Sequence, residues 1–171
     1  MRKGRPGGHS SDGNTMAQKT NALRIMESLG IACDVAVYET GDEHIDAVTV
    51  AHQIGVDAGI VFKTLVARNE RNGILVFCIP APAELDLKKA ARVSSSKKVE
   101  LISVKELLPL TGYVRGGCSP VGMKKAYPTW IDEMASAHER IYVNAGCRGM
   151  QAIISPEDLR RACDARFADL T

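Results

Sequence analysis

The sequence TGYVRGGCSPVGMKK, residues 111–125, holds four glycines and one proline in fifteen positions. This composition argues against an uninterrupted helix or strand, because glycine is conformationally free and proline has no backbone N–H. The Gly116-Gly117 pair can adopt positive φ and lets a ligand approach the backbone, and successive N–H groups in such a loop can converge on an oxyanion. The same composition fits a plain turn between two strands. The stretch therefore predicts a loop that either binds a ligand or only reverses the chain.

The composition of the whole chain predicts one globular domain. It has 171 residues, of which 45% are hydrophobic and 25% charged, as in ordinary soluble proteins with a sizeable core. Residues 1–18 are rich in Gly, Ser, Arg and Asn without an apolar period, which predicts a disordered or vector-derived lead before a domain of residues 19–171. The net charge of +2 is too small to demand a nucleic-acid partner, although pairs such as Lys124-Lys125 could form basic patches. Aromatic residues are only 5% of the chain, which disfavours a base-stacking RRM or OB platform.

The five cysteines indicate a reducing compartment rather than a disulfide framework. They are odd in number, widely spread and form no C-x-x-C motif, and the four histidines lack metal-ligand spacing with them. We find no secretory segment and no long apolar run in the sequence. The expectation is a cytoplasmic protein with no structural metal and no membrane contact.

Capping residues and apolar periodicity divide the chain into short elements. Thr20 and Asp46 are placed to begin helices that Gly30 and Gly55 end. We expect further helices after Asp86, Ser103 and Ser155, the last with an apolar stripe from Leu159 to Phe167, and strands at 33–39, 60–68, 74–79, 99–102, 129–131, 141–144 and 150–154. Because helices and strands interleave without strict alternation, the sequence predicts a mixed sheet.

Lys63 is the most informative single residue, because it interrupts an apolar strand. In the predicted strand 60–68 it shares one face with Val61, Leu65 and Ala67, and the opposite face is apolar too. A strand that is apolar on both faces is usually buried. Its lysine must therefore snorkel to solvent, pair with an acid or line a polar pocket.

Three other groups are weaker candidates for chemistry. Cys118 lies at the edge of the glycine loop and could act as a nucleophile. No His or Asp lies at a recognisable partner spacing, so the sequence favours a structural role for Cys118 as a small loop residue. Asp132 and Glu133 follow a predicted strand and could supply a general base, but the sequence identifies no partner carboxylate at a suitable distance. Tyr38 ends a predicted strand and is either a pocket wall or a core residue.

The glycine loop and three ordered motifs resemble the YbaK/EbsC family of aminoacyl-tRNA deacylases, which is related to the editing domain of prolyl-tRNA synthetase. The motifs are Phe62-Lys63-Thr64-Leu65-Val66, Leu85-Asp86-Leu87-Lys88-Lys89-Ala90 and Ala145-Gly146-Cys147-Arg148-Gly149. The resemblance runs from about Lys19 to Leu170. It implies an α/β fold of the α+β type, with a mixed, barrel-like β-sheet surrounded by helices.

The resemblance also implies an active site. The family's lysine in the F-K-T-L context lies in the active site, so we assign catalysis to Lys63, with Gly116 and Gly117 as backbone donors. For substrate binding we assign Tyr38, Thr64, Ser119, Pro120, Gly122, Asn144 and Gly146. The chain departs from the usual family pattern at Cys147, where lysine is common, and at Asn144, where serine is common, which leaves the preferred amino acid open.

The activity implied by the resemblance is trans-editing, the hydrolytic clearing of mischarged tRNA. The first expected substrate is Cys-tRNA(Pro), whose own thiol attacks its carbonyl while the enzyme contributes positioning and electrostatics. No cofactor is implied, and the expected partners are the tRNA for proline and prolyl-tRNA synthetase. Two alternatives stay open: deacylation of Ala-tRNA(Pro), and a module that binds tRNA or the synthetase without turnover.

Overall fold

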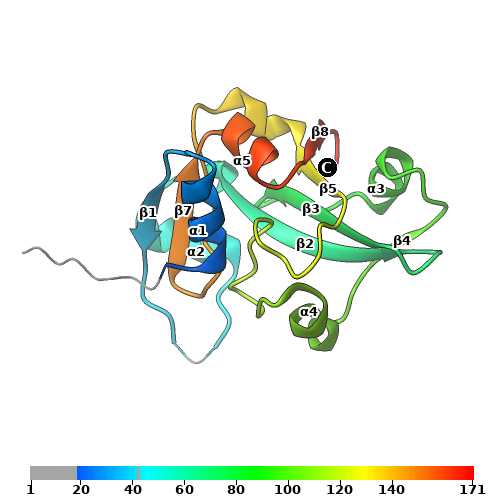
Figure 1. Ribbon diagram of the computed structural model, residues 1–171, viewed down its shortest axis with the longest axis horizontal. Coiled ribbons are helices and arrows are strands. Elements are labelled where there is room, and N and C mark those ends of the chain that lie inside the picture. The colour runs from blue at the N-terminus through cyan, green and yellow to red at the C-terminus, as the bar shows by residue number, and fades with distance from the viewer. Residues whose placement is uncertain (1–18, 42) are drawn as a thin grey trace, which may run out of the picture.

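A mixed β-sheet forms the centre of the molecule, and short helices pack around it (Figure 1). The computed structural model describes residues 19–41 and 43–171, so the predicted lead of residues 1–18 lies outside the described part. The strands of the sheet are β1 Asp34–Val37, β2 Val61–Asn69, β3 Ile74–Pro80, β4 Val99–Leu101, β5 Thr129–Asp132, β6 Ile141–Asn144, β7 Met150–Ile154 and β8 Arg166–Ala168. Their order is β1-β7-β6-β2-β3-β5-β8, and β4 pairs with β2 beside this path. Parallel and antiparallel ladders both occur, which confirms the predicted mixed sheet.

The helices begin and end where the sequence places capping residues. They are α1 Asn21–Ser28, α2 Ala47–Ile54, α3 Leu87–Val93, α4 Val104–Thr111 and α5 Pro156–Ala162, with 3-10 turns η1 Ala58–Ile60 and η2 Glu133–Ala137. The side chain of Thr20 accepts the N–H of Leu23, and that of Asp46 accepts the N–H of Thr49. Gly55 ends α2 at a φ of 75°, a left-handed conformation that glycine adopts without strain. None of the helices in the described ranges is long and apolar enough to cross a membrane.

Two strands, β6 and β4, pair with different parts of the same edge of β2, and the interval between them positions the site. Along one edge β2 pairs antiparallel with β3 from Phe62 to Arg68. Along the other edge its beginning pairs parallel with β6 at Val61 and Phe62, and its end pairs antiparallel with β4 from Ala67 to Asn69. The backbone around Lys63 thus lies between the two partner strands.

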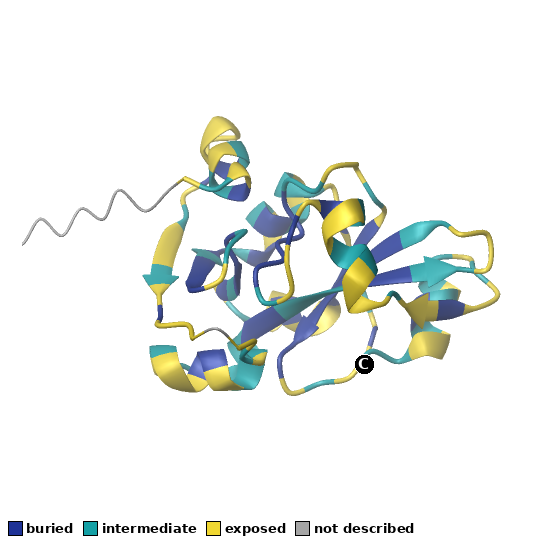
Figure 2. Cartoon of the chain, turned by 90° about the horizontal axis from the view of Figure 1, so that it is seen from below, coloured by how far each residue is buried: buried dark blue, intermediate teal, exposed yellow. Residues whose placement is uncertain are grey.

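Burial follows the central strands (Figure 2). One core cluster joins the first half of β2 to β5, β6, β7, α1 and α5, and includes Phe62, Ile131 and Ile154. A second lies at the other end of the β2–β3 hairpin, where the rings of Phe77 and Trp130 stack with centroids 5.4 Å apart. Together the clusters make the sheet a rigid support for loops at its edge.

The end of the chain differs from the prediction of one long apolar helix. Helix α5 ends at Ala162, and Asp164 takes a φ of 49°, which turns the chain away from the helical path. Phe167 therefore reaches the core from strand β8, which pairs parallel with β5. A helix-spaced apolar pattern can be produced by two elements that both face one core.

Asp132 is a structural residue and does not line the pocket described below. It is 1% exposed, and its carboxylate accepts the N–H of Met134 at 2.9 Å, the N–H of Leu170 at 3.1 Å and the hydroxyl of Thr171 at 3.3 Å. These bonds hold the segment after β8 against β5. The suggestion of a general base at Asp132 is wrong, because its oxygens serve this anchor.

We predict that Asp132→Ala lowers the free energy of unfolding by about 2–3 kcal/mol, because it leaves the N–H of the fully buried Leu170 without an acceptor. Urea denaturation monitored by tryptophan fluorescence measures the change. The matched control is Asp169→Ala, which removes only a surface ion pair with Lys89 and should cost about 0.5 kcal/mol or less. Equal losses in the two variants would contradict the anchoring role.

Candidate active site

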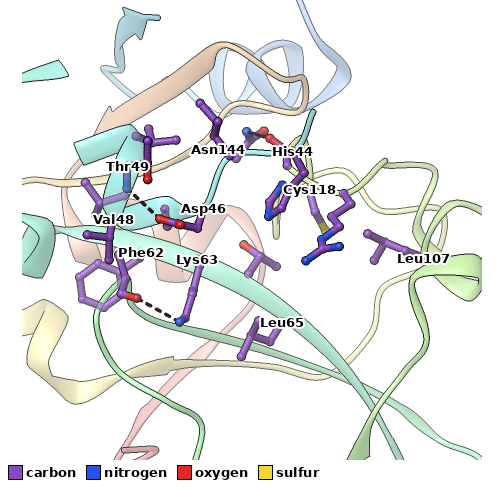
Figure 3. A pocket seen from close by; sticks show the side chains of 18 of the residues that line it. His44, Asp46, Val48, Thr49, Phe62, Lys63, Leu65, Leu107, Cys118 and Asn144 are labelled. Carbon is purple, nitrogen blue, oxygen red and sulfur yellow. Dashed lines mark hydrogen bonds between the residues drawn. The ribbon is translucent and has the colours of Figure 1, made fainter. Parts of the chain in front are cut away.

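A pocket of about 650 Å³ opens beside β2, where its outer edge passes from β6 to β4 (Figure 3). Its walls come from several separate parts of the chain. These are Tyr38 with residues 44–50, β2, Ala81 just after β3, the β4–α4 connection, the glycine loop, the end of β6 and the start of β7. The sequence-predicted residues that line it are Tyr38, Lys63, Thr64, Gly116 and Asn144.

Lys63 lies in the half-exposed part of β2, between buried residues on both sides. Val61 and Phe62 before it and Val66 and Ala67 after it are all buried, whereas Lys63 itself is partly exposed to the pocket. Its Nζ donates to the carbonyl oxygen of Ala81 at 3.0 Å, the dashed bond in Figure 3. Lys63 therefore lines a mainly apolar pocket, with its amine bonded to a backbone carbonyl and not to a carboxylate.

The amine of Lys63 is partly shielded from water. Burial lowers the pKa of its amine from the ordinary value, and the carboxylates of Glu84 and Asp46 act in the opposite direction. A lysine amine has three N–H donors, so the bond to Ala81 leaves others for a ligand. In a pocket from which water is partly excluded, such donors act more strongly on a developing negative charge than in water.

The two neighbouring glycines of the loop have different roles. Gly116 lines the pocket at a φ of 81°, and no acceptor within the described residues takes its N–H. The N–H of Gly117 donates to the carbonyl of Val114 at 2.9 Å, and Gly117 does not line the pocket. Of the two glycines, Gly116 alone lines the pocket with an N–H that no described acceptor takes, so the pair that the sequence suggested does not act together.

Gly117 is instead the point where two backbones meet. A Cβ there would stand 3.0 Å from the backbone nitrogen of Arg148 and 3.1 Å from the carbonyl carbon of Cys147. The glycine loop therefore lies directly on the turn between β6 and β7, so closely that a side chain at Gly117 would force one of the two backbones to shift by a few tenths of an ångström. This contact fixes the position of Gly116 at the pocket wall.

Asn144 fastens the same two segments from the side. Its Nδ2 donates to the carbonyls of Gly116 at 2.9 Å and Cys147 at 3.0 Å, and its Oδ1 accepts the N–H of Gly146 at 2.7 Å. We assigned Asn144 to substrate binding, and it does line the pocket. Both of its N–H donors are used on backbone carbonyls, so its observed role is to hold the loop and the turn together.

The remaining predicted residues lie behind the pocket and are not brought into it. The fully buried Ser119 accepts the N–H of Val121 at 3.1 Å, and Pro120 is buried beside it. Gly122 and Gly146 have φ values of 81° and 103° and pack near the side chain of Tyr113. Ser119, Pro120 and Gly122 shape the glycine loop, and Gly146 shapes the β6–β7 turn.

Reasoning from the sequence did not predict that three further residues line the pocket. Asp46 was recognised only as a helix cap, and His44 lies in a polar loop that offers no periodic signal. Gln151 could have been found by the reasoning used for Lys63, because it interrupts the apolar strand β7. It is 5% exposed and its Nε2 lies 3.3 Å from the hydroxyl oxygen of Tyr38, while its Oε1 is buried with no partner among the described residues. A buried acceptor without a donor indicates a place for a ligand's N–H.

The pocket is basic at its rim. The exposed Arg115 lines it, and the exposed Arg148 lies next to Arg115, with its Nε donating to the carbonyl of Arg115 at 2.8 Å. Neither arginine, nor Lys63, forms an ion pair with a carboxylate of the described chain. Free guanidinium groups of this kind suit phosphate or carboxylate groups of a ligand.

Cys118 lines the pocket but is a poor nucleophile. It is 8% exposed, and burial raises the pKa of its thiol to about 12, so the thiol is protonated at neutral pH. Residues 19–41 and 43–171 contain no group of three or more His, Cys, Asp or Glu that could hold a metal ion. The site therefore presents hydrogen-bond donors, an unpaired acceptor and positive charge.

The domain has a mixed sheet, and its pocket is lined by a lysine on a largely buried strand and by a glycine of the loop. This combination agrees with the class of protein that the sequence motifs predicted. The model of the aminoacyl-tRNA editing domain family matches residues 43–162. EbsC of Enterococcus faecalis, whose name proposes a Cys-tRNA(Pro)/Cys-tRNA(Cys) deacylase, is 43% identical over 154 residues, which cover 90% of this chain and 94% of EbsC. This chain therefore belongs to the aminoacyl-tRNA editing domain family, and the predicted family is confirmed.

Solved structures share the fold at lower sequence identity. A protein proposed as a trans-editing enzyme for prolyl-tRNA synthetase superposes with a TM-score of 0.74 at 24% identity, covering 88% of this chain and 92% of that one. The hypothetical protein APE2540 superposes with a TM-score of 0.79 at 21% identity, covering 88% and 98%. At these identities the similarity shows the fold alone.

We predict that Gly117→Ala destabilises the protein more than Gly116→Ala does. The first change inserts a methyl group between two backbones and should cost about 2–3 kcal/mol, as overpacking does. The second strains a residue at a φ of 81°, at a cost of about 1–2 kcal/mol, but its Cβ would meet only movable side-chain ends of His44 and Arg148. Chemical denaturation of both variants measures the difference. The reverse order would show that the loop and the turn are not in firm contact.

Proposed function

We propose that this protein is a trans-editing aminoacyl-tRNA deacylase that clears mischarged tRNA, with Cys-tRNA(Pro) as its first substrate. The observation that carries the proposal is that one pocket is lined both by Lys63 and by Gly116, whose N–H has no acceptor among the described residues, in a chain of the editing-domain family. The name of the 43% identical relative supports the choice of cysteine and of the tRNA for proline. The product is the free tRNA and the released amino acid in hydrolysed or cyclic form.

The chemistry fits a pocket that positions the substrate and stabilises charge. The substrate's thiol sulfur attacks its own carbonyl carbon, and the bond from that carbon to the ribose oxygen of the tRNA breaks. In this scheme the amine of Lys63 and the N–H of Gly116, two residues that line the pocket, stabilise the negative charge that develops on the carbonyl oxygen. The unpaired Oε1 of Gln151 suits the ammonium group of the aminoacyl moiety, which supplies the missing donor. No cofactor enters this scheme.

The rim of the pocket suits the nucleic-acid part of the substrate. Arg115 and Arg148 stand free of carboxylate partners in the described chain, and arginine pairs well with phosphate. The proposal includes prolyl-tRNA synthetase as a protein partner, and the cytoplasm, where translation draws on aminoacyl-tRNA, as the place of action.

The experiment that tests the proposal compares hydrolysis of Cys-, Ala- and Ser-tRNA(Pro) by the purified protein under single-turnover conditions. Preference for the cysteinyl ester supports the proposal. Preference for the alanyl ester would favour the Ala-tRNA(Pro) alternative, in which a bound water replaces the substrate thiol. Tight tRNA binding without hydrolysis of any ester would favour the non-catalytic module.

We predict that Lys63→Ala lowers the single-turnover rate by about 10²-fold or more, which corresponds to roughly 3 kcal/mol of transition-state stabilisation. The melting temperature should stay the same or rise, because a partly desolvated charge is removed from an apolar strand. Lys88→Ala, on the exposed surface of α3, is the matched control and should leave the rate unchanged. A turnover rate near that of the wild type in the Lys63 variant would remove Lys63 from the mechanism.

We predict that Cys118→Ala loses only a few-fold in rate, because a buried and protonated thiol contributes no nucleophile. The measurement is the single-turnover rate of a variant whose folding is verified by its thermal transition. Abolished deacylation in a folded Cys118→Ala protein would instead establish covalent catalysis by the enzyme.

A further inference from the structure

His44 enters the same cavity as Lys63, from the loop that precedes α2. Figure 3 shows its imidazole directed into the pocket from the segment between Tyr38 and Asp46. Its Nδ1 lies 3.0 Å from the point where a Cβ on Gly116 would stand, so this side of the ring meets the glycine loop. Nε2 is the ring nitrogen on the side away from this contact. The imidazole thus lies next to the residue whose N–H is free for an oxyanion.

The charged groups around His44 favour its neutral form. Arg115 of the glycine loop and Arg148 of the β6–β7 turn face it, Asp46 lies two residues further along its own segment, and Lys63 and Cys118 line the same cavity. Burial lowers the pKa of His44, the two arginines lower it further, and Asp46 acts in the opposite direction. A neutral imidazole is a proton acceptor at physiological pH. No described residue forms a hydrogen bond with its ring, so this capacity is unused within the protein.

The other titratable groups of the pocket are poor acceptors of a proton. The carboxylate of Asp46 is engaged by the N–H of Thr49 at 2.8 Å, and this bond lowers its pKa. Lys63 donates to Ala81, and the thiol of Cys118 is protonated at neutral pH. Arginine does not lose its proton in proteins. His44 is therefore the group of the pocket that combines an unoccupied acceptor atom with access to the cavity.

We propose that Nε2 of His44 accepts the proton of the attacking thiol and returns it to the leaving ribose oxygen. This inference rests on the proposed deacylase function and adds an enzyme acid–base to it. In the step, the bond between the substrate's sulfur and its carbonyl carbon forms, and the bond from that carbon to the ribose oxygen breaks. The thiol proton passes to His44 and then to the ribose oxygen, so that the imidazole ends neutral and no further reactant is needed.

The test is the pH dependence of single-turnover deacylation of Cys-tRNA(Pro), between about pH 5 and 9, corrected for spontaneous hydrolysis. For the wild type, the rate should fall on the acid side as His44 becomes protonated, below the ordinary pKa of about 6.5, because its pKa is lowered. His44→Gln keeps a polar side chain without a basic nitrogen, so it should lose about 10²-fold at neutral pH, and its rate should keep rising with pH up to the ionisation of the substrate's thiol instead of levelling off above the pKa of His44. The defect should narrow towards pH 9, where the substrate's thiol, with a pKa of about 8.5, ionises without help.

The matched control is His52→Gln, on the exposed side of α2 and outside the pocket, which should leave the profile unchanged. His44 is exposed, so its variant should keep the wild-type melting temperature, and a loss of rate then reports chemistry rather than folding. An unchanged rate in His44→Gln, or a defect that is constant across the pH range, would refute the proton transfer by His44 and leave the deacylase function standing. Absence of deacylation by the wild-type protein would overturn the deacylase function and this inference together.

Discussion

The division of β2's outer edge between β6 and β4 is the constraint on which the pocket depends. A backbone edge inside a sheet normally meets one partner along its length, which would place another strand, with its own side chains, beside Lys63 and its neighbours. Here β6 pairs only with Val61 and Phe62 before it ends at Asn144, and β4 joins only from Ala67 onward. The strand is buried before and after this interval and partly open within it. A lysine can therefore lie on a core strand and still reach a ligand.

The second constraint is the contact between the glycine loop and the β6–β7 turn. Gly117 allows the two backbones to touch, and Asn144 donates one hydrogen bond to each segment. The free N–H of Gly116 is held in place by these contacts, which do not involve a ligand. Preorganised donors of this kind contribute most to catalysis, because they need no rearrangement when charge develops.

Local features of the fold could be predicted from the sequence, whereas contacts between distant segments could not. Caps such as Thr20 and Asp46 act within one turn of helix, so sequence positions alone reveal them. The family motifs indicated Lys63 and the glycine loop, and the apolar strand around Lys63 supported the pocket. The use of the Gly117 N–H within its own loop, and the meeting of His44 with Gly116, depend on how separate segments pack. Phe167 shows the converse error, in which two elements facing one core imitate one helix.

The parallel pairing of β2 with β6 has a consequence for folding. Val61 and Phe62 meet Tyr142 and Val143, which are far along the chain, and the intervening residues must be organised before this ladder closes. Contacts of such large sequence separation form slowly and late, because the entropy of the enclosed loop is lost before the contact stabilises the chain. The ligand cavity needs both β6 and β4 in place, so partly folded states that retain only the β2–β3 hairpin have no binding site. Appearance of ligand binding during refolding would therefore report completion of the sheet rather than its nucleation.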